Sequence, residues 1–122
     1  MQGIVYILTN KNKTTLYTGV TSNLQRRIAE HKLHLNKGFS DTYNTEYLIY
    51  YEVHDKVTDA INRETCIKRW KREWKENLIN GFNPEWNDLS EEIGVDEAYL
   101  KAIKEAYDAG TLWKEQKVAD KR

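Results

Sequence analysis

Two tyrosines near the N-terminus, Tyr6 and Tyr17, are the residues whose type and spacing point most clearly to chemistry. If a polar turn centred between positions 11 and 12 joins two strands, Tyr6 lies directly opposite Tyr17 and both phenols point to one face, about 5 Å apart at Cβ. Arg27 and His31 follow four residues apart, so they would be neighbours on the surface of a helix. Two phenols beside a guanidinium and an imidazole form a plausible set of groups for phosphate chemistry.

These four residues need a β-hairpin and a helix to position them. Apolar and aromatic runs predict strands over 4–8 and 16–20, and apolar residues at helical spacing predict a helix over 24–35. Ser22, followed three residues later by Gln25, predicts a capping box at the start of this helix.

A third strand and a second helix complete the predicted fold. β-branched and aromatic residues over 47–54 are typical of a strand, and a helix is predicted from Thr58 or Asp59 to Lys75. The fold class is therefore α/β (α+β), with a small three-stranded, mostly antiparallel sheet flanked by helices. The inward stripe of the second helix is expected to contain Val57, Ala60, Ile61, Ile67, Trp70 and Trp74.

Glu64 lies near the middle of that apolar stripe. A carboxylate turned inward costs several kcal/mol if it is buried without a partner, so something must compensate it. Lys68, one turn later, is a simple ion-pair partner worth a few tenths of a kcal/mol at a surface. The inward direction favours a bound metal ion instead.

Taken together and in this order, the motifs resemble those of a small stand-alone, bacterial-type GIY-YIG nuclease domain, over residues 3–88. The sequence departs from the family name in two places, because Gly3 stands one place early and Thr18 occupies the middle of the second tripeptide. Both departures spare the tyrosines. The residues that carry the resemblance are Ile4-Val5-Tyr6, Tyr17-Thr18-Gly19, Arg27, His31, Glu64 and Asn83 before Pro84.

The resemblance implies a metal-dependent endonuclease that hydrolyses phosphodiester bonds in DNA. Tyr6 would act as general base and Arg27 would stabilise the phosphate, while Glu64 would hold one Mg²⁺ or Mn²⁺ ion. Tyr17 and His31 would orient the water or the tyrosine. A free phenol has a pKa near 10 and is a poor base at pH 7, so the role requires nearby positive charge to favour the phenolate.

DNA, including branched or structured DNA, is the expected partner although the net charge of the chain is zero. Residues 63–75 hold six basic side chains against two acidic ones, which predicts a local, salt-sensitive nucleic-acid interface. Trp70 and Trp74 are expected in the core rather than as a platform for base stacking. Gly19 would either relieve crowding or let a phosphate approach the backbone. The predicted nucleic-acid contacts are Gly19, Arg26, Lys68, Lys71, Arg72 and Asn83.

The length of 122 residues predicts one nuclease-like domain over 1–90 and a C-terminal helical extension over 91–122 that is not an independent domain. Residues 95–110 show helical spacing and are a candidate surface for a protein partner. Two other functions therefore stay open: an inactive nucleic-acid-binding module of the same fold, and a protein-interaction module that uses the C-terminal helix. A single cysteine and the lack of a long apolar run predict a cytoplasmic protein without a membrane segment.

Overall fold

The computed structural model describes residues 1–35 and 43–110, and its centre is a three-stranded antiparallel sheet. The strands are β1 (Gly3–Thr9), β2 (Leu16–Thr21) and β3 (Tyr47–His54), in the spatial order β2-β1-β3. The helices are α1 (Leu24–Lys32), α3 (Val57–Lys68), α4 (Arg72–Phe82) and α5 (Glu97–Asp108). This confirms the predicted fold class, and β3 has the predicted bounds.

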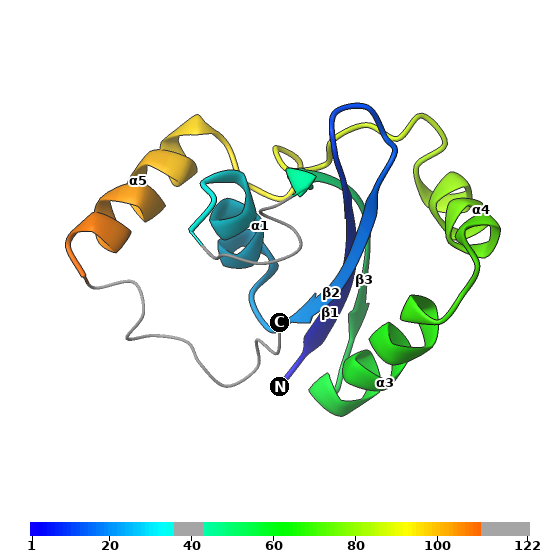
Figure 1. Cartoon of the computed structure of the whole chain (residues 1–122). Coiled ribbons are helices and arrows are strands. Elements are labelled where there is room, and N and C mark those ends of the chain that lie inside the picture. Colours follow the sequence, from blue (N-terminus) through cyan, green and yellow to red (C-terminus); the bar gives the residue numbers. More distant parts are fainter. Residues whose placement is uncertain (36–42, 111–122) are drawn as a thin grey trace.

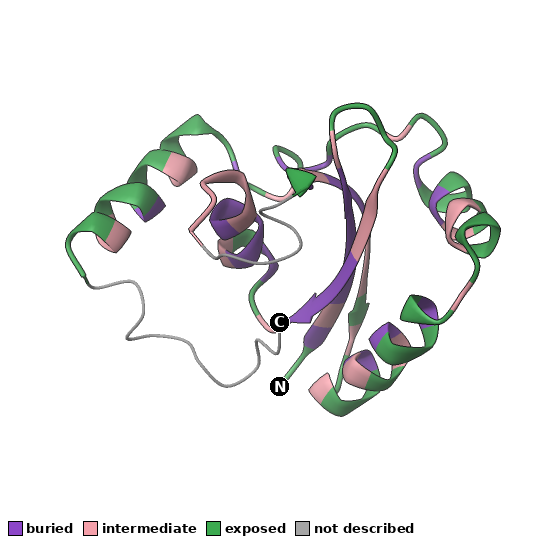
Figure 2. Ribbon diagram, in the orientation of Figure 1, coloured by how far each residue is buried: buried purple, intermediate pink, exposed green. Residues whose placement is uncertain are grey.

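The sheet separates two groups of core residues. α1 and α5 lie on one face, and α3 and α4 lie on the other (Figure 1). Buried positions follow the strands and the sides of the helices that face them (Figure 2). The first core includes Tyr6, Leu8, Ile28, Leu48 and Ile103. The second includes Val5, Ile7, Val20, Ile49, Ala60, Ile67 and Ile79.

The predicted pairing within the first hairpin is wrong by two residues. Tyr6 pairs with Gly19, and Tyr17 pairs with Leu8. The turn is centred one residue later than expected because the Asn10 side chain accepts hydrogen bonds from the Thr14 and Thr15 amides. Since side chains alternate with a period of two, this slip leaves both tyrosines on the same face.

α1 begins and ends differently from its prediction. Its N-cap is Asn23, whose side chain accepts a hydrogen bond from the Arg26 amide, so the predicted capping box of Ser22 and Gln25 is not formed. The Gln25 side chain instead donates to the carbonyl of Ile93 in the segment before α5. The helix ends at Lys32, because His34 takes a left-handed backbone conformation with a φ of 56°.

The helix predicted from Thr58 or Asp59 to Lys75 is two helices. α3 ends at Lys68, and Lys71 has an extended backbone before α4 starts. No glycine or proline marks this break in the sequence. The change of direction lets Ile79 of α4 pack into the second core, and it leaves Trp74 50% exposed rather than inward.

α5 belongs to the described part of the C-terminal extension, and residues 111–122 lie outside the described residues. Its apolar side packs on the first core, where Val95 and Ile103 are buried. The side chain of Asp96 caps the helix by accepting from the Tyr99 amide. The surface that a protein partner would meet on α5 is therefore its polar outer side. Across the described ranges, no helix has both the length and the apolar character needed to cross a membrane.

Candidate active site

Tyr6, Tyr17 and His31 form one compact aromatic cluster between the sheet and α1. The Tyr6 hydroxyl lies 3.1 Å from Nε2 of His31 in a hydrogen bond. The His31 ring lies edge-on to both phenols, with ring centres 5.8 Å from Tyr6 and 5.3 Å from Tyr17. The two phenols are 6.4 Å apart between ring centres. The structure therefore brings together three of the residues that the sequence pointed to.

Gly19 makes room for the Tyr6 ring. A Cβ atom at position 19 would lie 2.5 Å from both Cζ and the hydroxyl oxygen of Tyr6, which is closer than real Cβ contacts occur. Because Tyr6 and Gly19 are paired across β1 and β2, the phenol lies over the glycine. Of the two readings of Gly19, relief of crowding is the one that this contact supports directly.

His31 is held in its neutral form. Burial, followed by the positive charge of Arg27 and a contribution from His34, lowers the pKa of His31 to about 3. The tautomer with an unprotonated Nε2 accepts the hydrogen bond from the Tyr6 hydroxyl. An acceptor that stays neutral at pH 7 pulls on the phenol proton without adding positive charge to the site.

Arg27 is buried in the same region, at 4% exposure, although arginine is rarely buried without a partner. Its guanidinium lies 3.8 Å from the carboxylate of Glu30, which is 1% exposed. Sequence reasoning missed Glu30. The available signal was its position three residues after Arg27, where helical side chains meet.

Glu64 lies on the opposite face of the sheet from the two phenols. It stands in α3 between Ala60 and Ile67, whose side chains belong to the second core. Its carboxylate is 1% exposed and lies 3.0 Å from the ammonium of Lys68. The predicted inward direction is thus observed, together with the simple ion pair that the sequence also allowed.

β2 is one of the two edge strands of the sheet and lies beside β1. Tyr17 and Gly19 point to the α1 face, so Thr18 and Val20 point to the α3 face. α3 packs against both β1 and β2. α3, which carries Glu64, therefore lies on the opposite side of β2 from the face that carries Tyr17.

The donor set of Glu64 suits a hard divalent cation held by few protein ligands. No cluster of three or more His, Cys, Asp or Glu residues capable of holding a metal occurs among residues 1–35 and 43–110. Mg²⁺ is typically bound by one or two carboxylates and completes its shell with water and phosphate oxygens. A single glutamate fits that mode and does not fit a cage made only of protein ligands.

The predicted nucleic-acid contacts fall into two groups. Lys68, Lys71 and Arg72 are exposed at the junction of α3 and α4. Arg72 also donates to the carbonyls of Lys13 and Thr14, which ties α4 to the hairpin turn. Arg26 is half-buried and its charge acts on Tyr99 of α5.

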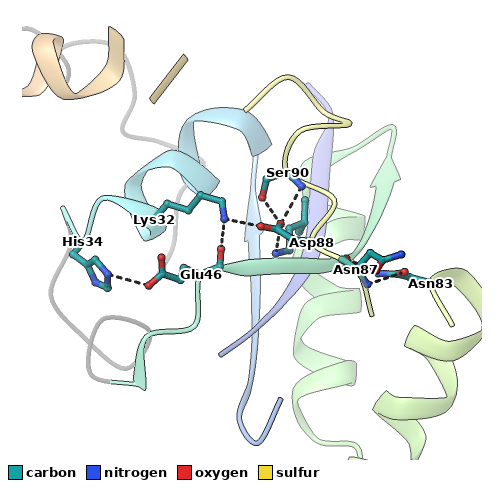
Figure 3. Close-up of polar contacts among 8 residues, drawn as sticks. Lys32, His34, Glu46, Asn83, Asn87, Asp88 and Ser90 are labelled. Carbon is teal, nitrogen blue, oxygen red and sulfur yellow. Dashed lines mark hydrogen bonds and ion pairs between the residues drawn. The ribbon is translucent and has the colours of Figure 1, made fainter. Parts of the chain in front are cut away.

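Asn83 is turned inward and holds the chain after α4 against β3. Its side-chain amide donates to the carbonyls of Ile49 and Asn87, and its carbonyl oxygen accepts from the Asn87 amide (Figure 3). The side chain is 6% exposed, and its hydrogen bonds stabilise this turn. Its contact to nucleic acid, if made, would come from the segment that it positions.

Asp88 is a second residue that sequence reasoning missed. One carboxylate oxygen accepts from Lys32 at 2.8 Å, and the other accepts from the Leu48 amide and from Ser90 (Figure 3). Burial alone would raise the pKa of Asp88, but these hydrogen bonds and the Lys32 charge hold it below its ordinary value. Asp88 thus links the end of α1, the start of β3 and the segment before α5.

The geometry agrees with what comparison with known proteins shows. A family model described as the GIY-YIG catalytic domain matches residues 2–77. Since this match covers more than half of the chain, the protein belongs to the GIY-YIG domain family. Its relatives include a UPF0213 protein of Clostridium perfringens, which is 32% identical over 75% of this chain and 97% of that protein.

Two further proteins that resemble this chain are also UPF0213 proteins. A UPF0213 protein of Staphylococcus haemolyticus is 35% identical over 62% of this chain and 90% of its own length. The solution structure of a UPF0213 protein from Bacillus halodurans covers 83% of this chain and 94% of its own at 22% identity, with a TM-score of 0.43. The family model and the Clostridium perfringens relative confirm, at the level of the family, the sequence resemblance stated above.

Proposed function

We propose that this protein is a metal-dependent endonuclease that hydrolyses phosphodiester bonds in DNA. One observation carries the proposal: the Tyr6 hydroxyl is hydrogen-bonded to a neutral His31, with Tyr17 packed against the same imidazole. Membership of the GIY-YIG family supports a nuclease-type function for this cluster.

Hydrolysis of a phosphodiester adds water across a P–O bond, so a proton must leave the attacking water and one must reach the departing oxygen. Tyr6 is proposed to relay the first proton: its own proton would pass along the hydrogen bond to Nε2 of His31 as the phenol oxygen accepts a proton from the attacking water. Tyr17 is the more exposed of the two phenols and is proposed to position the water. Arg27 supplies positive charge close to the cluster, as the lowered pKa of His31 indicates.

Glu64 would hold Mg²⁺ or Mn²⁺ together with water and phosphate oxygens, since its carboxylate is a hard oxygen ligand. When bound, such an ion supplies a Lewis acid that polarises the phosphoryl oxygen and stabilises developing negative charge. The backbone of the substrate is proposed to follow β2, an edge strand of the sheet, so that it would meet the face that carries Tyr17 and the face that carries Glu64.

Electrostatic contact to DNA is proposed for Lys68, Lys71 and Arg72, which are exposed side chains. Gly19 and Asn83 would act through the backbone that they position, and Arg26 through its place between α1 and α5. Phosphate contacts of this kind weaken as salt concentration rises.

The test is cleavage of supercoiled plasmid and of a branched DNA substrate with Mg²⁺, Mn²⁺ or EDTA. Cutting should require the metal, and Tyr6→Phe and Glu64→Gln should each lower it by about 100-fold or more, since each removes a group acting on the reacting atoms. Tyr17→Phe, tested beside Tyr6→Phe, shows how the work is divided between the phenols.

Matched controls separate chemistry from folding. Tyr51 pairs with Tyr6 across β1 and β3 and packs on the same core, so Tyr51→Phe should retain activity. Glu76→Gln is the equivalent control for Glu64→Gln, because Glu76 forms an ion pair one helix later. Equal activity in Tyr6→Phe, Glu64→Gln and the wild-type protein would exclude the proposed roles, and binding without any cutting would favour the inactive binding module.

A further inference from the structure

A groove next to the α3–α4 junction combines two tryptophans with an amide. It has a volume of about 390 Å³ and is lined by Trp70, Trp74, Asn77 and Leu78. The groove is shallow and open to solvent along its length. Trp74 is 50% exposed, although sequence reasoning placed it in the core. Packing in the hydrophobic core therefore does not account for the position of the Trp74 indole.

The two indoles are fixed relative to one another. Their ring centres are 6.2 Å apart and their planes meet at 77°. The guanidinium of Arg63 lies 5.2 Å from the centre of the Trp70 ring, and Arg63 is itself held by Glu52 at 2.9 Å. Trp70 is therefore a supported wall of the groove, and Trp74 is the ring that reaches the solvent.

The rim of the groove is positively charged. Between positions 68 and 75 the chain carries five basic residues and one acidic residue, Glu73. Two of the five are balanced, because Lys68 pairs with Glu64 and Arg72 pairs with Glu76. The remainder includes Arg69, Lys71 and Lys75, and the ammonium of Lys71 lies 5.7 Å from the centre of the Trp74 ring.

The positive charges are close enough to repel one another. Burial, together with the charges of Arg72 and Lys68, lowers the pKa of Lys75 below its ordinary value. An anionic ligand on this surface would relieve that repulsion. Charge therefore favours a polyanion over a neutral or basic peptide as the occupant of this surface.

We propose that the groove binds an unpaired base of single-stranded DNA, which stacks on Trp74 while the adjoining phosphates lie against the basic rim. Every nucleobase offers a π face to an indole, and this mode of binding is tolerant of sequence. The Asn77 amide, on the groove wall, has both donors and an acceptor for the edge of a base. A base in a continuous duplex is stacked on its neighbours and is not available for such a contact.

This inference deepens the proposed function and rests on it, because it names the class of DNA that the nuclease would favour: DNA with unpaired bases near the point of cleavage. Lys68 connects the two sites, since it pairs with Glu64 on α3 and its charge acts on Lys75 on α4. The groove would therefore hold a single-stranded segment on the α3–α4 side of the sheet, the side that also carries Glu64.

The test measures binding in EDTA, so that it does not depend on catalysis. Fluorescence anisotropy is recorded for a labelled oligothymidylate and for a duplex of the same length. Trp74→Ala should weaken binding of the single strand by about tenfold, since one stacked base contributes roughly that much, and should change duplex binding by less than about twofold. Trp74→Phe, which restores an aromatic ring, should recover most of the loss.

Phe82 provides the matched control, because it is an exposed aromatic residue of the same helix that packs on Tyr50 and Tyr51 rather than lining the groove. Phe82→Ala should leave both affinities within about twofold. Unchanged single-strand affinity in Trp74→Ala, or an equal loss in Phe82→Ala, would overturn the proposal. The same holds if a peptide or protein ligand occupies the groove while single-stranded DNA does not bind.

Cleavage assays with Mg²⁺ distinguish this proposal from the nuclease proposal. If the wild-type protein cuts no DNA but Trp74→Ala selectively weakens single-strand binding, the groove proposal stands and the nuclease proposal is wrong. If the wild-type protein cuts DNA and Trp74→Ala binds every substrate normally, the nuclease proposal stands and the groove proposal is wrong. Melting temperatures of the variants show whether each is folded.

Discussion

The two faces of the sheet are built from alternate residues of the same strands, yet they differ in how their functional groups are held. On the α1 side, Tyr6 and His31 are fixed by a hydrogen bond inside a continuous core. On the α3 and α4 side, Glu64 is buried, but Trp74 and the basic residues of the junction are exposed. The first face is suited to precise chemistry, and the second is suited to holding a long, charged ligand.

This difference has a physical origin in the elements that cover each face. α1 follows directly from β2, and Gln25 hydrogen-bonds it to the segment before α5, so its side chains have little freedom to shift. Between α3 and α4 the backbone is extended at Lys71, the N-cap residue of α4, and the Lys71 side chain makes no capping hydrogen bond to that helix. Substitutions should therefore act mainly on chemistry and stability on the first face and, apart from those at Glu64, mainly on ligand affinity on the second.

Gly19→Ala is expected to affect cleavage and stability together. The added methyl would overlap the Tyr6 ring, so the phenol must move or the strands must separate. We expect a loss of roughly 1–3 kcal/mol in the free energy of unfolding from overpacking. We also expect cleavage to fall by about 100-fold, because a small displacement of the Tyr6 hydroxyl disrupts the catalytic geometry.

The control for Gly19→Ala is Gly81→Ala. Gly81 lies inside α4 with open space around its missing Cβ, so alanine should raise stability by about 0.5–1 kcal/mol through helix propensity. Urea denaturation and plasmid cleavage measure both effects. A Gly19→Ala protein as stable and active as the wild type would show that the close packing of Tyr6 on β2 is not needed.

Ile103→Ala tests whether α5 is part of the first face. Ile103 is 8% exposed in the core that contains Tyr6, and its truncation should cost about 2–4 kcal/mol in the free energy of unfolding. Lys101→Ala, at an exposed position of the same helix, should be close to neutral. If both variants unfold at the wild-type urea concentration, α5 is an appendage that the nuclease-like domain does not need.

How much of this arrangement the sequence predicts depends on the periodicity involved. The hairpin prediction was two residues out of register, but the period of two in a strand kept Tyr6 and Tyr17 on one face. The helix prediction fails past Lys68, because a break without glycine or proline changes the direction in which Trp74 points. An error of two residues in strand register keeps each side chain on its face, whereas an undetected break changes the direction of every helical side chain beyond it.

Long-range polar partners were the least predictable part of the site. The family motifs indicated Arg27 and His31, but not the buried carboxylate of Glu30. Asp88 contacts Lys32, which is 56 residues away in the chain. Such pairs are set by tertiary packing, and a single sequence carries no local signal for them.

The free energy of unfolding should depend on pH through His31, a residue of the first face. The pKa of His31 is lowered on folding, so the unfolded chain binds its proton first and stability is lost as pH falls from about 6.5 toward 3. Between pH 6.5 and 5 this one residue should cost on the order of 2 kcal/mol. His31→Gln should flatten that part of the profile in urea denaturation. An identical slope in His31→Gln and the wild type would mean that the buried imidazole does not control acid stability.

The smallest effect is expected at the contact that ties α4 to the hairpin. Arg72 donates to the carbonyls of Lys13 and Thr14 and pairs with Glu76, but its side chain is 44% exposed. Arg72→Ala should therefore lower the free energy of unfolding by only about 1 kcal/mol. Arg69→Ala, an exposed arginine in the same junction, is the control for loss of charge and should change stability less.

In Arg72→Ala, amide exchange should accelerate in α4 and remain unchanged in α1, since α4 would lose an anchor that the first face does not use. Equal acceleration in both helices would show that the two faces unfold together and that their difference lies in chemistry alone.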